Sequence, residues 1–152
     1  PYLSGIRTPH EYPNIEGSIF GLNLNTNKKN IAWTIIEGIS FIFKECQDLL
    51  INNNYNFPKE IVLIGGGAKN IQWAKILSSL LNVKILVPEN QDYVASIGAI
   101  RLAMNNLTMS KYKPIFPESN VIDVDVRLRE ILLERFDRYI EHQKLLFNLK
   151  NC

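Results

Sequence analysis

Three consecutive glycines, Gly65 to Gly67, form the stretch of this chain with the clearest capacity for chemistry. They follow the apolar run Ile61–Ile64 and precede a segment, residues 68–81, whose apolar residues have helical spacing. Because glycine has no Cβ, a ligand can approach the backbone closely at such a turn. The free N–H groups at the start of the following helix favour an anion or the polar edge of a ligand. The stretch is therefore a candidate nucleotide site.

The glycine turn matches neither of two common phosphate-binding motifs. A P-loop would continue with Gly-Lys-Ser/Thr, which is absent here. The dinucleotide fingerprint Gly-x-Gly-x-x-Gly does not fit, because position 70 is Asn and no later glycine completes the spacing. Taken alone, the turn is compatible both with a nucleotide site and with a plain connection between a strand and a helix.

Around this turn, the pattern of apolar residues predicts alternating strands and helices. Strands are expected at Ser18–Leu24, at Ile61–Ile64, covered on both faces, and at Lys84–Val87. Helices are expected at about residues 30–52, 68–81, 93–106 and 123–149. The first helix should bury one face made up of Ile31, Ile35, Ile39, Ile42, Cys46 and Leu49. This order predicts an α/β sheet with helices on its faces, in which ligands bind beyond the carboxyl ends of the strands.

Composition excludes several classes of protein. The chain has 152 residues, is 46% hydrophobic and carries a net charge of +2, which fits a globular protein without a nucleic-acid footprint. Its apolar runs are too short for a membrane span, and the sequence contains no signal-peptide pattern. The two cysteines, Cys46 and Cys152, suit neither a metal site nor a disulfide framework. A cytoplasmic location is expected.

The chain opens with an irregular segment and without an initiator Met. A domain rarely begins with so long a loop, so we expect the chain to belong to something larger. Neither histidine has a partner motif for catalysis. His10 is expected to have a structural role in this loop, and His142 is expected on the exposed side of the last helix.

Several short motifs occur in order along the first 107 residues: Pro1-Tyr2-Leu3-Ser4-Gly5, Arg7-Thr8-Pro9-His10, Gly17-x-x-Phe20-Gly21-Leu22, Glu37-Gly38, Leu63 to Lys69 with Trp73, and Ala95-x-Ile97-Gly98-Ala99. Together they resemble the FGGY carbohydrate kinases and, within them, the xylulokinases. The resemblance implies the second half of an actin-like (ribonuclease H-like) ATPase domain, with three strands, flanking helices and a C-terminal helix. It divides the chain into the C-terminal portion of the kinase domain (1–107), a linker (108–122) and an appended helix (123–149).

The chemistry implied by this resemblance is phosphoryl transfer from ATP, with Mg2+, to a sugar hydroxyl, most readily that of xylulose. The family's aspartate base would lie upstream of Pro1, so no catalytic residue is expected in this chain, and the isolated chain is expected to be inactive. Asp92, which precedes a predicted helix, is better explained as its N-cap.

Half of a nucleotide site remains. By resemblance, Gly66, Gly67 and Ala68 lie against the adenosine or ribose, and Asn70 offers an amide to the base or sugar. Trp73, one helical turn further on, is expected to pack in the core and not to stack on the base. Gly98 is expected to be a helix-packing contact.

Two departures from the family pattern occur together. The family usually has Glu where this chain has Ile6, and Arg where it has Glu16. We interpret these positions as an ion pair in relatives, because losing both charges at once avoids a buried unpaired charge.

Three functions compete at this point. The first is part of an ATP-dependent sugar kinase, with a sugar and ATP as partners and a possible homodimer. The second is a degenerate or truncated actin-like fragment that acts only in nucleotide binding or assembly. The third, an NAD-linked Rossmann enzyme, is disfavoured by the glycine spacing and by the absence of an acidic residue at the end of the 84–87 strand.

Overall fold

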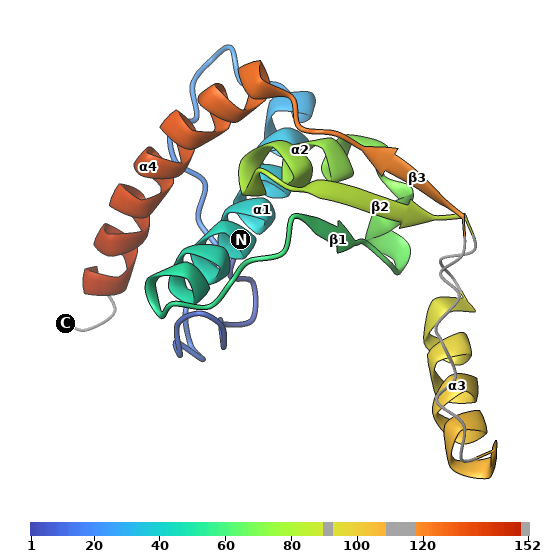
Figure 1. Cartoon of the computed structure of the whole chain (residues 1–152). Coiled ribbons are helices and arrows are strands. Elements are labelled where there is room, and N and C mark those ends of the chain that lie inside the picture. Colours follow the sequence, from blue (N-terminus) through green and yellow to red (C-terminus); the bar gives the residue numbers. More distant parts are fainter. Residues whose placement is uncertain (90–92, 109–117, 150–152) are drawn as a thin grey trace.

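Three short strands form one sheet in the order β1-β2-β3 in the computed structural model, which describes residues 1–89, 93–108 and 118–149. The strands are β1 (Glu60–Val62), β2 (Lys84–Pro88) and β3 (Ser119–Ile122). The helices are α1 (Lys28–Asn52), a short 3-10 helix η1 (Gly66–Lys69), α2 (Ile71–Leu81), α3 (Val94–Thr108) and α4 (Val126–Leu149). Figure 1 shows α1, α2 and α4 gathered on one side of the sheet, with α3 standing away from them.

The sheet is mixed. β1 runs parallel to β2, with Ile61 opposite Ile85, and the connection between them passes through η1 and α2. β3 runs antiparallel to β2, with Ile122 opposite Ile85. The prediction of a linker over 108–122 is therefore wrong at its end, where residues 119–122 are a strand of the sheet. The short, half-polar sequence Ser-Asn-Val-Ile has too little alternation to reveal a strand that pairs only at the sheet's edge.

The helix predictions hold for α1 and α3 to within two residues at each end. α1 begins at a capping box in which Asn27 and Asn30 accept from each other's backbone N–H groups at 3.1 and 3.0 Å. α4 begins later than residue 123, because Asp125 is the preceding cap and its Oδ1 accepts from the N–H of Leu128 at 3.0 Å. Asp92 lies outside the described residues.

The expected strand at Ser18–Leu24 is wrong. This segment is irregular, Gly21 within it has a φ of +81°, and the side chains of Leu22 and Leu24 are exposed. Phe20 stacks on His142 of α4, with ring centroids 4.5 Å apart, so His142 also has a packing partner that was not expected. A strand needs a neighbour for its backbone N–H and C=O groups, and no described segment pairs with this one.

α2 covers one face of the sheet. Its apolar residues pack on the alternate residues of β2 that point toward it, and this core consists of Ala68, Ala74, Leu77, Leu81, Val83, Ile85 and Val87. A second core joins α2 to α1 and α4, and consists of Phe41, Ile76, Leu80, Leu132 and Phe136. The other face of the sheet is open: Val62 and Ile64 are exposed, so the expectation that this strand is covered on both faces is wrong.

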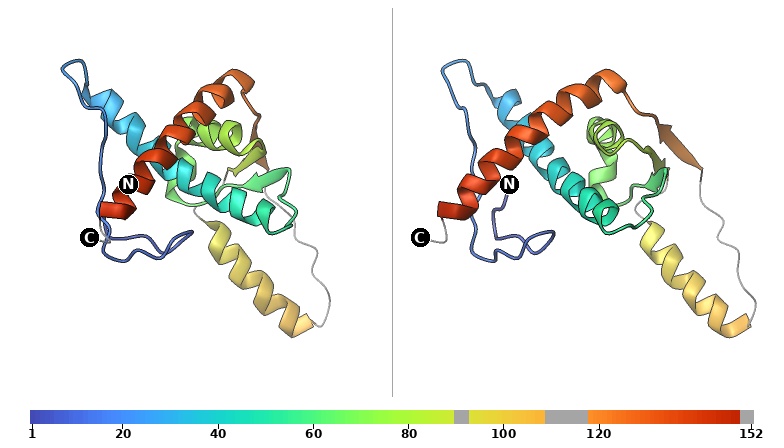
Figure 2. Two further views of the ribbon diagram at one scale, coloured as in Figure 1. Left: turned by 90° about the vertical axis from the view of Figure 1, so that its left-hand side faces the viewer. Right: turned by 60° about the vertical axis from the view of Figure 1, so that its left-hand side comes forward.

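α3 makes little use of its small residues. The two views in Figure 2 show it projecting from the body of the molecule. An ideal Cβ on Gly98 would meet no described heavy atom within 4 Å, so the expected packing contact at Gly98 is not present among the described residues. Ile100 and Leu102 are exposed on this helix.

α1 packs with the opposite face to the one expected. Ile35, Ile39 and Leu49 of the predicted buried stripe are exposed. Two of the buried residues of α1 are Phe41 and Gly38. The other buried residues are polar, and they are Glu37, Ser40, Glu45 and Gln47. The apolar spacing therefore predicted the helix correctly and its packed face wrongly.

Each buried polar side chain of α1 bonds to another element. Glu37 Oε1 accepts from Arg135 Nη1 of α4 at 2.5 Å, and Gln47 Nε2 donates to the carbonyl of Leu81, at the end of α2, at 2.8 Å. Trp73 Nε1 of α2 donates to Ser40 Oγ at 3.0 Å. These contacts are directional, so they fix how α2 and α4 lie on α1.

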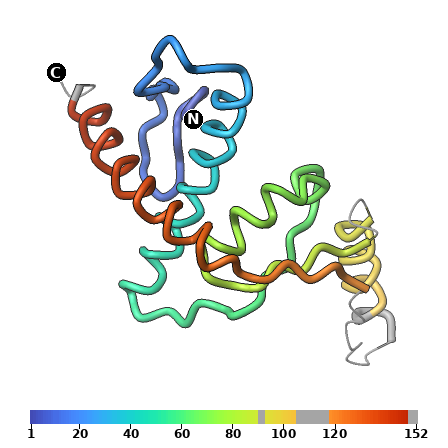
Figure 3. The backbone as a smooth tube through the Cα atoms, turned by 90° about the horizontal axis from the view of Figure 1, so that it is seen from above, coloured from blue at the N-terminus to red at the C-terminus, as the bar shows by residue number. Residues whose placement is uncertain are grey.

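Glu45 anchors the N-terminal loop, which lies between α1 and α4 (Figure 3). Its carboxylate accepts from His10 Nε2 at 2.7 Å, from Tyr139 Oη at 2.9 Å and from Gln143 Nε2 at 2.9 Å. Burial is the main cause that raises the pKa of Tyr139, with its hydrogen bond to Tyr2 and the charge of Glu45 adding to it. His10 thus has the structural role expected for it.

The same loop explains the residue at position 6. Ile6 is 6% exposed and packs with Tyr2, Ile15 and Phe147. The N–H of Gly5 donates to the carbonyl of Ile15 at 3.2 Å, so positions 6 and 16 belong to neighbouring parts of one folded loop, while Glu16 itself is exposed. An unpaired Glu at position 6 would be buried, as the interpretation of a lost ion pair requires.

We predict that two phenylalanines two residues apart on α1 differ strongly in their contribution to stability. Phe41→Ala should cost about 3–5 kcal/mol of unfolding free energy, because Phe41 is 4% exposed. Phe43→Ala, the matched control at 47% exposure, should cost about 1 kcal/mol or less. Chemical denaturation measures both values. Equal losses would mean that the exposed side chain of Phe43 is covered in solution.

We also predict that Ile6→Glu destabilises the chain by about 3–5 kcal/mol, because it buries an unpaired carboxylate. Adding Glu16→Arg should restore part of this loss, whereas Glu16→Arg alone should change stability by no more than about 0.5 kcal/mol. The double-mutant cycle is read from denaturation curves. A double variant no more stable than Ile6→Glu would contradict the ion-pair interpretation.

Candidate nucleotide-binding site

The glycine turn lies directly after β1, at the carboxyl ends of the two parallel strands. The ladder continues one residue past β1, where the N–H of Leu63 donates to the carbonyl of Leu86 at 2.9 Å. The chain then leaves the sheet through Gly65 and enters η1. In open α/β sheets, ligands bind beyond this end of the strands, so the turn is placed where a ligand site is expected.

Gly65 supplies the backbone conformation of the turn. Its φ of 85° and ψ of −175° lie in a region that is open essentially to glycine alone. Its carbonyl accepts from the N–H of Ala68 at 3.0 Å, which starts η1. Gly65 therefore directs the chain from the strand into the helix.

Gly66 faces open space. An ideal Cβ on this residue would have no described heavy atom within 4 Å, and its φ lies outside the left-handed region. Neither its conformation nor its described neighbours therefore require a glycine. A ligand that approaches the backbone here would supply such a requirement.

Gly67 meets the protein itself. An ideal Cβ on Gly67 would lie 2.1 Å from Cζ3 of Trp73, which no real side chain could tolerate. Trp73 is half-buried and packs against the core beneath the sheet, as expected for it. The ring thus occupies the space that a side chain at Gly67 would need.

Ala68 is a correction to the predicted site. It is fully buried within the core under α2, so it presents no surface to a ligand. The resemblance places Ala68 against the adenosine or ribose, whereas in the structure it belongs to the 3-10 helix η1 and packs into the core. The N–H of Ala68 is also used, since it donates to Gly65.

Asn70 has a structural task that leaves its amide nitrogen available. Its Oδ1 accepts from the N–H groups of Gln72 at 3.1 Å and Trp73 at 3.2 Å, so it is the N-cap of α2. The predicted single helix over 68–81 is therefore two helices that meet at this cap. Asn70 is exposed, and its Nδ2 group is not needed for the cap.

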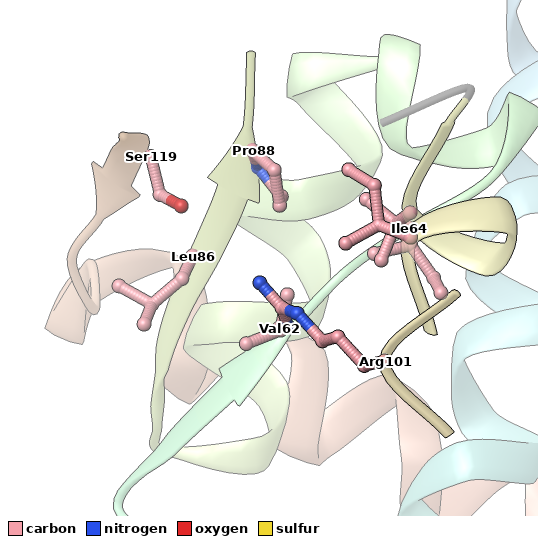
Figure 4. Close-up of a pocket in the computed structure, with 8 residues that line it drawn as sticks. Val62, Ile64, Leu86, Pro88, Arg101 and Ser119 are labelled. Carbon is pink, nitrogen blue, oxygen red and sulfur yellow. The ribbon is translucent and has the colours of Figure 1, made fainter. Parts of the chain in front are cut away.

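A cavity of about 230 Å³ lies on the open face of the sheet, beside the turn. Figure 4 shows its lining, with Arg101 reaching from α3 toward Val62. The remaining lining is almost wholly apolar and comes from β1, β2, β3, α3 and Ile64, which follows β1. The sequence analysis missed it, although the alternation of Val62 with Ile64 and of Leu86 with Pro88 places these residues on one face.

Neither a metal-holding cluster nor a membrane-spanning helix occurs among the described residues. Within residues 1–89, 93–108 and 118–149, no group of three His, Cys, Asp or Glu side chains could hold a metal ion. In the same part of the chain, no helix has both the length and the apolarity to span a membrane.

Cys46 is a free, half-buried thiol, and burial raises its pKa.

The family model described as FGGY family of carbohydrate kinases, C-terminal domain, matches residues 1–107. The chain belongs to this family. It is 39% identical over 104 residues to the xylulose kinase of Staphylococcus xylosus, a match that covers 68% of this chain and 21% of that protein. The chain thus spans about a fifth of the length of the curated relatives it matches.

Solved structures of the family resemble nearly the full length of this chain. A kinase from Brucella ovis, described as a xyloylose kinase, matches with a TM-score of 0.87 at 28% identity. This match covers 97% of this chain and 32% of the Brucella ovis chain. The ligand-bound xylulose kinase from Lactobacillus acidophilus matches with a TM-score of 0.81 at 25% identity, and the match covers 96% of this chain and 30% of that kinase. The fold is that of the actin-like C-terminal domain, and the likeness extends past residue 107 into β3 and α4.

We predict opposite effects of alanine at the first two glycines. Gly65→Ala should cost about 1–3 kcal/mol of unfolding free energy, because alanine is strained at a φ of 85°. Gly66→Ala should leave stability unchanged or raise it by up to about 1 kcal/mol, because it meets no described atom and restricts the unfolded chain. Thermal unfolding compares them; a loss at Gly66 as large as that at Gly65 would show that this space is occupied.

Proposed function

We propose that this chain contributes the adenosine side of the ATP site in a cytoplasmic sugar kinase. The observation that carries the proposal is the open space at Gly66, in a glycine turn at the carboxyl end of β1. The family match and the names of the relatives support it, since those relatives are called xylulose kinases. D-xylulose is accordingly the proposed sugar and xylulose 5-phosphate the proposed product.

Within this proposal, the protein backbone does most of the binding. Gly66 lets the ribose or base approach the chain, and Asn70 Nδ2 donates to a ring nitrogen or hydroxyl while Oδ1 holds the helix cap. Gly67 contributes through its backbone only. We no longer include Ala68, because it is fully buried.

ATP supplies the phosphoryl group when it is bound, and the residues of this chain would only hold its nucleoside end. We assign no residue of this chain to Mg2+, since the described side chains form no group that could hold a metal. The proton of the sugar hydroxyl needs a base. None of the described aspartates lies at the turn, and Asp125 is a helix cap.

A non-catalytic fragment that binds nucleotide or assembles with a partner, including a second copy, is the alternative. The observation that favours it is the changed pair Ile6 and Glu16, which departs from the family pattern in a folded loop. An in-frame actin-like half encoded before Pro1 would favour the kinase.

We predict that the 152-residue chain binds ADP without catalysing transfer. In an NMR titration, ADP should shift the backbone amide signals of residues 65–70, and Gly66→Ala should weaken binding by about tenfold while the fold is kept. In a coupled assay, ATP and xylulose should yield no ADP above background. Absence of any shift at these amides would overturn the proposed site, and xylulose-dependent ADP release would overturn the assignment of the base to another segment.

A further inference from the structure

We propose that Trp73 is a positioning residue for the nucleotide-binding turn, and that Gly67 lacks a side chain because of Trp73 and not because of the ligand. The inference rests on the proposed function of this site. It separates two adjacent glycines that look alike in the sequence: Gly66 serves the ligand, whereas Gly67 serves the protein.

The contact between Gly67 and the indole is the first observation. An ideal Cβ on Gly67 would lie 2.1 Å from Cζ3, 2.9 Å from Cε3 and 3.1 Å from Cη2 of Trp73. These three atoms belong to the six-membered ring, so the ring lies directly against the backbone of the turn. Any side chain at Gly67 must displace either the ring or the turn.

The indole is held in place from several directions, which is the second observation. Its Nε1 donates to Ser40 Oγ at 3.0 Å, and Ser40 Oγ in turn donates to the carbonyl of Ile36 at 2.8 Å. Ser40 is fully buried, so this bond is shielded from water. The ring of Phe43 meets the indole edge-on, with centroids 6.3 Å apart.

The backbone of Trp73 is also tied to the site. Its N–H donates to Asn70 Oδ1 at 3.2 Å, in the cap that orients the amide of Asn70. Trp73 therefore touches the turn at Gly67 through its ring and the proposed ligand-binding residue Asn70 through its backbone. α1, through Ser40, sets the position of the ring and hence of the turn.

The test is a double-mutant cycle with Gly67→Ala and Trp73→Leu, which removes the ring atoms that collide with the new Cβ. Gly67→Ala should lower Tm by about 4–10 °C through overpacking. In the Trp73→Leu background, Gly67→Ala should lower Tm much less. Gly66→Ala, the matched control, should show no such dependence on Trp73. Equal Tm losses from Gly67→Ala in both backgrounds would overturn the proposal.

Nucleotide affinity tests the positioning role, which stability alone does not. In ADP titrations followed by NMR, Trp73→Leu should weaken binding about tenfold. Trp73→Phe, which keeps an aromatic ring but loses the bond to Ser40, should weaken binding less than Trp73→Leu does. Unchanged affinity in Trp73→Leu, with a wild-type chain that binds ADP, would overturn this proposal and leave the proposed function standing. Absence of ADP binding by the wild-type chain would overturn both.

Discussion

Buried polar contacts along one side of α1 hold the other elements of this chain in place. Glu37 reaches α4, Ser40 reaches Trp73 of α2, Glu45 holds the N-terminal loop, and Gln47 bonds to the end of α2. A buried polar group without a partner is costly, so each of these side chains permits only a narrow range of positions for its partner. The apolar cores supply attraction between the helices, and these bonds decide their register.

This arrangement also explains how a surface turn can be ordered. The glycine turn has open space at Gly66 on the outside, and its own backbone bonds are few. Its support comes from beneath, through the indole of Trp73, and the indole is fixed by the buried Ser40. A binding site built on backbone needs such rigid support, because a loop that moves would lose in entropy what its contacts gain.

The sequence predicted helices better than it predicted faces. α1 and α3 and the strand β2 follow from local periodicity, which depends only on residues near one another. The packed face of α1 could not be predicted in this way, because the apolar stripe that contains Ile35 and Ile39 is exposed. Periodicity indicates that a helix has an apolar side and does not indicate which element covers that side. Ser18–Leu24 shows the same limit for strands, whose existence depends on a neighbour.

The three glycines illustrate the limit most sharply, because one residue type answers three separate demands. Gly65 is required by a backbone angle, Gly67 by the ring of a residue six positions away, and Gly66 by nothing within the described protein. A sequence pattern records only the absence of side chains, so it treats the three glycines as one candidate turn, and the resemblance places Gly66, Gly67 and Ala68 together against the nucleoside. Dihedral angles and atomic distances together separate them: Gly65 has a positive φ, Gly67 has an atom of Trp73 in contact with the missing Cβ, and Gly66 has neither. Gly66 is thus the glycine of this turn that neither its backbone angle nor a described neighbour accounts for, which is why the proposed ligand contact is assigned to it.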